Sequence, residues 1–334
     1  MDLSTFNSDP PPLVPGVAGL RASIVLLARI AGPTIVAAAV VVGAAEAWFR
    51  LDPSEVPTDL ESIVLQAQQA RARSIGAADL LIVGDSSGLM DVDAGRLAAL
   101  IERPVESLAV IGFASPRGFA ALLGEYAKRA QPTTILLVMH GESLNLPEQT
   151  FSGLGLEEQA VSGRRRRPAP PGVGARRRLF ETLVAPLVDF PLPGAYGSYY
   201  GMGAELRRRL SLGHGSLVDP SQSWTAGQRI DYAFSVSDAV RTRLPAIDAS
   251  VTFPATLNLI ISPVPWSALN TVTAESRDRA SVQVLEALGS RWRRIDTPVG
   301  LDDALFATLT HLNAHGRQQF TEQLAAALLA QPRP

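Results

Sequence analysis

Short, mostly apolar runs recur along the chain from residue 78 onward, separated by polar segments and by glycine and proline. Runs of this length are typical of parallel strands that are covered on both faces of a sheet. The pattern predicts strands at Leu80–Val83, Val105–Val110, Thr134–Met139, Leu257–Ile261 and Trp292–Ile295.

Segments that fit helices lie between these runs. They predict helices at Ala94–Ile101, Pro116–Arg129, Asp231–Arg243, Thr273–Leu288 and Gly316–Leu329. Strands that alternate with helices predict an α/β fold, a three-layer sandwich around a mostly parallel sheet. In such a sheet, ligands bind at the carboxyl ends of the strands.

One longer apolar run precedes this domain. Ile30–Phe49 contains a single ionisable residue, Glu46, and about 20 apolar residues are enough to span a membrane. Arg21 and Arg29 precede the run and Arg50 follows it, so the basic residues favour a cytoplasmic N-terminus. We therefore expect a single-pass protein of the cell (inner) membrane whose soluble domain is extracytoplasmic. The Ala-rich end of the run leaves a cleaved signal peptide as the alternative.

The expected organisation follows from these segments. It comprises a cytoplasmic tail at 1–20, a transmembrane anchor at 21–50, a linker and helix at 51–77, and the α/β domain at 78–330. The strand–helix alternation breaks around 151–230, which we interpret as an insertion. Its arginine clusters at 164–167 and 176–178 fit a solvated loop, and contact with an anionic lipid or glycan is the alternative.

The composition excludes several classes of function. A net charge of -2 over 334 residues offers no basic excess for a nucleic-acid partner. The absence of cysteine rules out disulfides, thiol catalysis and cysteine metal sites. The candidate bases are the four histidines, His140, His214, His311 and His315. No carboxylate or third-histidine motif completes a metal site with them, so we predict no metal and no cofactor.

The end of the first predicted strand carries Gly84-Asp85-Ser86. A serine on a strand-to-helix turn presents its hydroxyl at the edge of the sheet, near backbone N–H groups that can hold an oxyanion. Such a serine needs a base within hydrogen-bond reach, and His311, after the last strand, is the candidate. The alternative is structural: Asp85 and Ser86 cap a helix, and the histidine only precedes one.

Two segments, Gly84-Asp85-Ser86 and His311-Leu312-Asn313 with Gly316 and Phe320, resemble the SGNH (GDSL-like) hydrolase superfamily. The resemblance covers roughly residues 78–330 in the order of elements. The His-Leu-Asn-x-x-Gly pattern is similar to the membrane-anchored branch, which includes the alginate O-acetylation proteins and the D-alanine transfer protein of teichoic acid systems. This implies a flavodoxin-like sheet and a catalytic domain outside the cell.

The resemblance also implies roles for individual residues. Ser86 matches the nucleophile, His311 the base, and Gly112 the glycine whose N–H helps to hold the oxyanion. Ser143 stands where the family usually has asparagine, and its hydroxyl is a second candidate donor to the oxyanion.

The family's acid normally lies three residues before the histidine, where this chain has Thr308. Asp303 is close in sequence and is the candidate acid that would orient the imidazole. Asp85, His140 and Asn313 are the candidates for contact with the substrate.

Three functions fit these residues. The first is an extracytoplasmic serine acyltransferase or acyl esterase that acts on a cell-surface glycan beside a membrane-bound O-acyltransferase. The second is a non-catalytic accessory protein of such a transferase, because Thr308 and Ser143 depart from the family pattern. The third is a lipase-like hydrolase at the membrane, with a groove lined by Tyr196, Tyr199, Tyr200 and Met202.

Overall fold

The structure is a computed structural model that describes residues 60–154, 203–217, 234–270 and 274–331, with a few isolated positions elsewhere. The chain divides after Asp52, and every helix and strand named below lies in the second unit, Pro53–Pro334. Among the described residues, no helix has the length and apolar character needed to cross a membrane. Most of the predicted anchor at 21–50 and much of the predicted insertion at 151–230 fall outside them.

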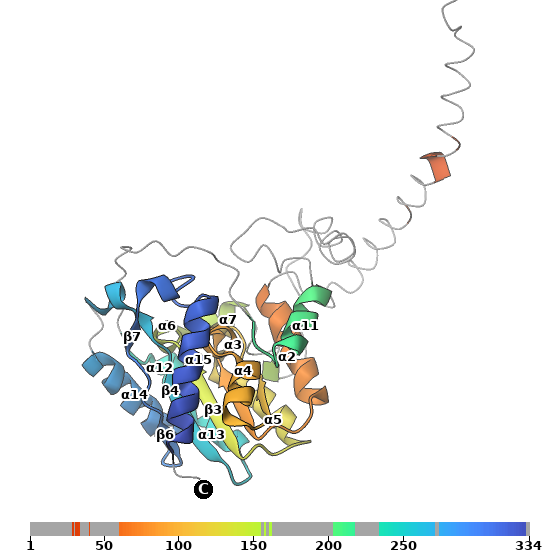
Figure 1. Cartoon of the computed structure of the whole chain (residues 1–334). Helices are drawn as coiled ribbons and strands as arrows, with labels where there is room; N and C mark the ends of the chain where they lie inside the picture. Colours follow the sequence, from red (N-terminus) through yellow and green to blue (C-terminus); the bar gives the residue numbers. More distant parts are fainter. Residues whose placement is uncertain are drawn as a thin grey trace, which may run out of the picture. The chain divides into compact units, whose positions relative to one another are not determined.

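A five-stranded parallel sheet forms the centre of this unit (Figure 1). Its strands are β1 (Leu80–Gly84), β2 (Val105–Ser107), β3 (Thr134–Met139), β4 (Thr256–Ile261) and β6 (Trp292–Arg294), in the spatial order β2-β1-β3-β4-β6. A separate pair joins β5 (Val264–Pro265) to β7 (Gly300–Leu301). The α/β class with a mostly parallel sheet is thereby confirmed.

The central strands are apolar because both of their faces are covered. Every residue of β1 and of β3 is buried. The strands pair in register from Leu80 beside Thr134 to Gly84 beside Val138. Continuous apolar runs therefore identified these strands correctly, as expected for a sheet between two helical layers.

Helices lie on both faces of the sheet. α4 (Ala94–Ile101) packs against α15 (Ala314–Leu329), and Figure 1 shows this pair in front of the strands. α2 (Leu60–Ser74), α5 (Ser115–Ala127), α13 (Pro245–Ser250) and α14 (Ala274–Leu288) form a second, connected series. The chain moves one way along the sheet from β1 to β2 and the other way from β2 to β3, so right-handed crossovers place α4 and α5 on opposite faces.

Short helices connect these elements. They are α3 (Ser86–Met90), α6 (Gly141–Leu144), α7 (Glu148–Leu154), α11 (Gly203–Leu212) and α12 (Asp238–Arg241), with 3-10 turns η1 (Gly112–Ala114), η3 (Trp266–Asn270) and η4 (Asp303–Leu305). A single residue separates each of two helices from the strand before it: Asp85 lies between β1 and α3, and His140 lies between β3 and α6. The first turns of both helices therefore lie at the carboxyl edge of the sheet.

Two predicted elements differ from the structure. The strand predicted at Val105–Val110 ends at Ser107, although the N–H groups of Leu108 and Val110 still donate to the carbonyls of β1. The helix predicted at Asp231–Arg243 is confirmed only in part, because within its described residues α12 starts at Asp238 and ends at Arg241. There the Ser237 side chain accepts the N–H of Val240 at 3.2 Å and caps the helix.

The strand order reverses beside β1, since β2 lies on one side of it and β3 on the other. Ligand sites in parallel sheets form outside the carboxyl ends of the strands at such a reversal. β1 ends at Gly84 and its neighbour β3 ends at Met139. The Asp85–Ser86 and His140–Gly141 segments therefore leave the sheet next to each other.

Candidate active site

Ser86 and His311 meet at this edge of the sheet. Ser86 is the first residue of α3, and His311 lies between η4 and α15. The Nε2 of His311 is 3.0 Å from the Oγ of Ser86, although the residues are 225 positions apart in the sequence. The histidine is 5% exposed and the serine is partly exposed. The structure thus brings the predicted nucleophile and base within hydrogen-bond reach.

Asp85, the residue before Ser86, is completely buried. Its carboxylate accepts the N–H of Ser87 at 2.8 Å and the N–H of His140 at 2.7 Å. Burial raises the pKa of Asp85 to about 6, while hydrogen bonds from His140, Ser143 and Ser87 act in the opposite direction. The side chain holds the ends of β1 and β3 together. This position corrects the predicted substrate contact, because Asp85 has no exposed surface.

A buried pair of hydroxyl groups extends this network to β4. Ser262, directly after β4, donates from its Oγ to the Oγ of Ser87 at 3.0 Å, and both residues are fully buried. The hydroxyl of Ser87 in turn hydrogen-bonds to Asp85. Side chains therefore connect the carboxyl ends of three adjacent strands. Sequence reasoning missed both serines, and their only signal was a polar residue just after an apolar run.

Gly112 packs against the same network. A Cβ at this position would lie 2.7 Å from the Oγ of Ser143 and 3.5 Å from the Cβ of Asp85, so a larger residue would displace Ser143. The hydroxyl of Ser143 hydrogen-bonds to Asp85. A hydroxyl has one proton to donate, so Ser143 donates to the carboxylate in this structure. Gly112 and Ser143 therefore lie together beside Asp85, the residue that precedes Ser86, and their oxyanion roles stay predictions.

Ser115 holds a strained backbone at the end of the η1 turn. Its φ of 63° and ψ of 165° lie in a region that is almost reserved for glycine. It is completely buried, and its Oγ accepts the N–H of Arg117 at 3.2 Å. A conformation of this kind costs on the order of 1–3 kcal/mol and is usual at functional sites. We infer that it fixes the turn that carries Gly112, a feature with no signal in the sequence.

His140 stays uncharged close to the pair. Burial lowers the pKa of His140 to about 3, and the neighbouring His311 acts in the same direction. Its Nδ1 accepts the N–H of Glu142 at 3.2 Å, so the neutral ring carries its proton on Nε2. Only 2% of the residue is exposed. This burial does not favour the predicted contact with substrate and leaves His140 as a neutral neighbour of the base.

The segment that carries His311 is anchored to the end of α3. The N–H of Leu312 donates to the Oδ1 of Asp91 at 2.9 Å, and Asp91 is 1% exposed. One turn into α15, the guanidinium of Arg317 lies 3.4 Å from the carboxylate of Asp93. Both contacts join the C-terminal segment to the loop between α3 and α4. The position of His311 therefore depends on residues that sequence reasoning did not single out.

Asn313 caps α15. Its Oδ1 accepts the N–H groups of His315 and Gly316, both at 3.0 Å, and its Nδ2 donates to the carbonyl of Ala304 at 2.7 Å. The cap starts the helix at Ala314, slightly before the predicted Gly316. Both ends of the amide bind the protein itself, and the role of Asn313 as a substrate contact stays a prediction.

Thr308 and Asp303 occupy the positions considered for the catalytic acid. The Oγ1 of Thr308 accepts the backbone N–H of His311 at 3.0 Å, so this residue shapes the histidine turn. The Oδ1 of Asp303 accepts the N–H of Ser267 at 3.0 Å, which ties η4 to η3. The role of Asp303 as the acid stays a prediction.

The other candidates lie apart from the pair. The Nδ1 of His214 is 3.1 Å from the carboxylate of Glu106 on β2, and His315 is exposed. Tyr196, Tyr199, Tyr200 and Met202, suggested for a lipase-like groove, fall outside the described residues. In the part of the chain that the structure describes, no group of three or more His, Asp or Glu side chains is arranged to hold a metal ion.

Comparison with known proteins returns no match: no family model fits the chain, and no curated protein resembles it. The chemistry of the site is therefore inferred from its own residues.

Proposed function

We propose that this chain is an SGNH-like serine acyltransferase or acyl esterase that acts on a cell-surface glycan through Ser86 and His311. The observation that carries the proposal is the 3.0 Å contact between the Nε2 of His311 and the Oγ of Ser86. A ring nitrogen within reach of a serine hydroxyl is the arrangement that makes the hydroxyl nucleophilic.

The reaction divides into two halves. The Oγ of Ser86 attacks the carbonyl carbon of an acyl donor while its proton passes to the Nε2 of His311. The bond to the donor's alcohol then breaks, and the departing oxygen takes the proton from His311, leaving an ester on Ser86. A second hydroxyl (from a sugar in transfer, from water in hydrolysis) attacks this ester, and the same proton shuttle restores the serine.

Backbone N–H groups support the charge that develops on the carbonyl oxygen. Ser86 begins α3, and the first N–H groups of a helix have no partner within that helix. Gly112 lies against Asp85, the residue that precedes the nucleophile. We assign the oxyanion to the N–H groups of Ser86 and Gly112. One such donor typically contributes about 100- to 1000-fold in rate.

We infer the cellular setting from the sequence. The strand order β2-β1-β3-β4-β6 is the flavodoxin-like order, which supports the SGNH-like assignment. The apolar run within 21–50 supports an anchor in the cell (inner) membrane with the catalytic domain outside. The resemblance to the membrane-anchored branch supports a glycan acceptor and a membrane-bound O-acyltransferase as partner.

The geometry favours catalysis over a purely accessory role. A histidine ring turned away from Ser86 would have suited an accessory protein, whereas the ring nitrogen is at hydrogen-bond distance. The buried Asp85 network and the strained Ser115 hold the surrounding turns in place. Such support is what a preorganised site requires.

Labelling of the serine tests the proposal. The full-length chain is treated with a fluorophosphonate probe, together with Ser86→Ala, His311→Ala and His315→Ala. His315 is exposed and lies in the same segment, so its variant is the matched control. We expect stoichiometric labelling of the parent chain and of the His315 variant, and none in the other two.

A different result would redirect the assignment. Labelling of the parent chain no greater than that of Ser86→Ala would contradict autonomous catalysis and favour the accessory role. If the His311→Ala variant is labelled as fast as the parent chain, the histidine is not the base. If labelling occurs as expected, release of the acyl group to water or to a glycan then separates the esterase from the transferase.

A further inference from the structure

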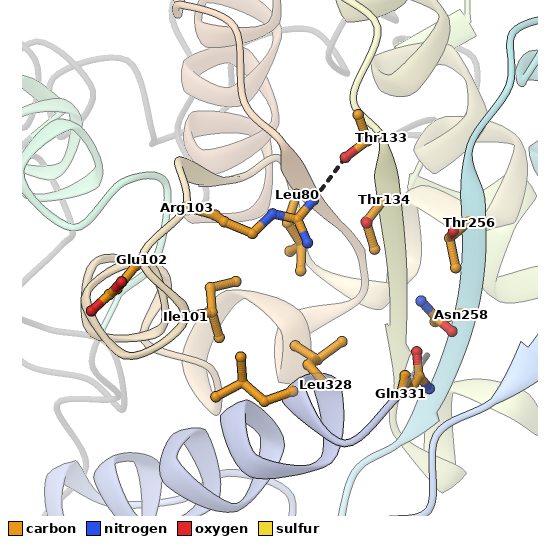
Figure 2. Close-up of a pocket in the computed structure, with 11 residues that line it drawn as sticks. Leu80, Ile101, Glu102, Arg103, Thr133, Thr134, Thr256, Asn258, Leu328 and Gln331 are labelled. Carbon is orange, nitrogen blue, oxygen red and sulfur yellow. Dashed lines mark hydrogen bonds between the residues drawn. The ribbon is translucent and has the colours of Figure 1, made fainter. Parts of the chain in front are cut away.

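Figure 2 shows a cavity of about 550 Å³ in the structure. It lies at the opposite end of the sheet from Ser86. It is lined by Leu80, Thr134 and Thr256, residues at the amino ends of β1, β3 and β4, and by Ile101 and Leu328 near the ends of α4 and α15. The site described above lies at the carboxyl ends of the same strands. The cavity is therefore a separate feature of the fold.

One wall of this cavity is Asn258, a polar residue in a buried strand. It is the third residue of β4, between Leu257 and Leu259, and it is 0% exposed. Among the described residues, neither its Nδ2 nor its Oδ1 has a hydrogen-bond partner. Because side chains alternate along a strand, Asn258 shares its face with Thr256, which lines the same cavity.

An unpaired amide in this position is costly. Leaving a buried donor or acceptor unsatisfied costs on the order of 1–3 kcal/mol, and native proteins satisfy the large majority of such groups. Leucine has a similar volume and would pack in the same strand at no such cost. The unpaired amide of Asn258 therefore indicates a molecule that enters the cavity and completes its hydrogen bonds.

The remaining lining residues define the chemistry of that molecule. Leu80, Ile101 and Leu328 provide an apolar wall, and the neighbouring Leu329 is 57% exposed at the same cavity. An aliphatic group would cover these side chains. The apolar wall therefore fits the aliphatic body of a ligand. The amide of Asn258 fits a polar group at one end of that ligand, which we call its head.

The charges at this cavity favour an uncharged head. Arg103 is already engaged, since it donates to the Oγ1 of Thr133 at 2.7 Å and lies 3.6 Å from the carboxylate of Asp79. Glu102 adds a negative charge to the lining. An ionised carboxylate or ammonium would gain little from these groups and would lose its hydration beside Asn258.

We propose that this cavity is a second binding site, which takes an uncharged aliphatic molecule whose head both donates and accepts hydrogen bonds, as a primary carboxamide does. The head pairs with the amide of Asn258, and the aliphatic body lies against the leucine and isoleucine side chains. Because Asn258 is fully covered, side chains of the lining rotate on binding. Gln331, which lines the cavity just after α15, is long and flexible enough to do so.

The test uses the full-length protein and hexanamide as the probe. Binding is followed by saturation-transfer NMR and by the rise in Tm with probe concentration. A probe of this size is expected to bind with a Kd of about 1–10 mM. Hexanoate, which is charged, and hexanenitrile, which only accepts hydrogen bonds, are expected to bind at least about 5-fold more weakly, because neither completes the hydrogen bonds of Asn258.

Variants identify the site. Asn258→Leu should fold, since apolar replacement of an unpaired buried amide is neutral or stabilising, and should weaken hexanamide binding by about 10-fold or more. Thr256→Val, a smaller change in the same wall, should weaken it less. Thr252→Val, at an exposed position that does not line the cavity, is the control and should bind as the parent does.

Two results would overturn the proposal. One is the absence of any hexanamide signal at 50 mM, on the order of five times the weakest expected Kd, which would leave water as the occupant of the cavity. The other is equal binding by the parent chain and Asn258→Leu, which would place the probe elsewhere. Serine labelling at the opposite end of the sheet is measured separately, so neither result depends on the proposed enzymatic function.

Discussion

Replacing Asp85 with asparagine tests whether the site rests on a buried carboxylate that resists ionisation. Asp85 is fully buried and accepts hydrogen bonds from the N–H groups of Ser87 and His140. Asparagine has nearly the same shape and does not titrate. A comparison of the two proteins over a range of pH therefore isolates the ionisation of this one group.

The sign and size of the effect follow from the pKa. Burial raises the pKa of Asp85 from 3.8 to about 6, so the folded state holds the proton more tightly than the unfolded state. The protonated carboxyl thus contributes stability at pH below about 4, and this contribution is lost as the pH rises through 6. The whole effect is about 3 kcal/mol, at about 1.4 kcal/mol per pKa unit. About 2 kcal/mol of it falls between pH 4 and pH 7.

The assay is urea unfolding of the parent chain and of Asp85→Asn at several values between pH 4 and pH 7. Other titrating groups contribute nearly equally to both proteins and cancel in the difference. We expect the free energy of unfolding of the parent, relative to the variant, to fall by about 2 kcal/mol across this range. A difference that stays constant with pH, or rises, would refute the reasoning, because Asp85 would then not be ionising at a raised pKa.

Three further predictions concern the surrounding residues. Gly112→Ala places a Cβ 2.7 Å from the Oγ of Ser143 and should displace the turn that holds the Gly112 N–H, so serine labelling should slow about 100-fold in a folded protein; an unchanged rate would contradict the view that close packing at Gly112 positions this N–H. Asp91→Ala removes the acceptor of the buried Leu312 N–H, so urea unfolding should show a loss of about 1–3 kcal/mol and labelling should slow; stability equal to the parent would refute the anchor. Burial lowers the pKa of His140 to about 3, so His140→Gln should leave the pH midpoint of labelling in place, and a shifted midpoint would show that this ring titrates.

Local pattern was enough to place most of the sheet. The runs that became β1, β3 and β4 are apolar because strands covered on both faces must be. The α4 helix was predicted at Ala94–Ile101 and lies there. The sequence did not reveal α13 or the early end of β2, because short elements depend on packing more than on their own composition.

The sequence also determined which residue types stand at the strand ends. Gly84-Asp85-Ser86 and His311 were recognisable as a possible nucleophile and base from their positions after β1 and before α15. Their contact was only a hypothesis at that stage, because it joins residues 225 positions apart. Only the order of the strands and the return of the last helix decide whether such segments meet.

Only the tertiary structure showed what the residues around Ser86 and His311 do. Asp85 and Asn313 looked like substrate contacts in the sequence, and the structure makes one a buried carboxylate and the other a helix cap. The link from Asp91 to Leu312 and the unpaired Asn258 in β4 were equally invisible. Burial and hydrogen-bond partners depend on neighbours that are distant in the chain, whereas periodicity depends on neighbours that are close. The sequence of this protein therefore specified its elements and its reactive residue types, and the packing of the sheet decided which of them act together.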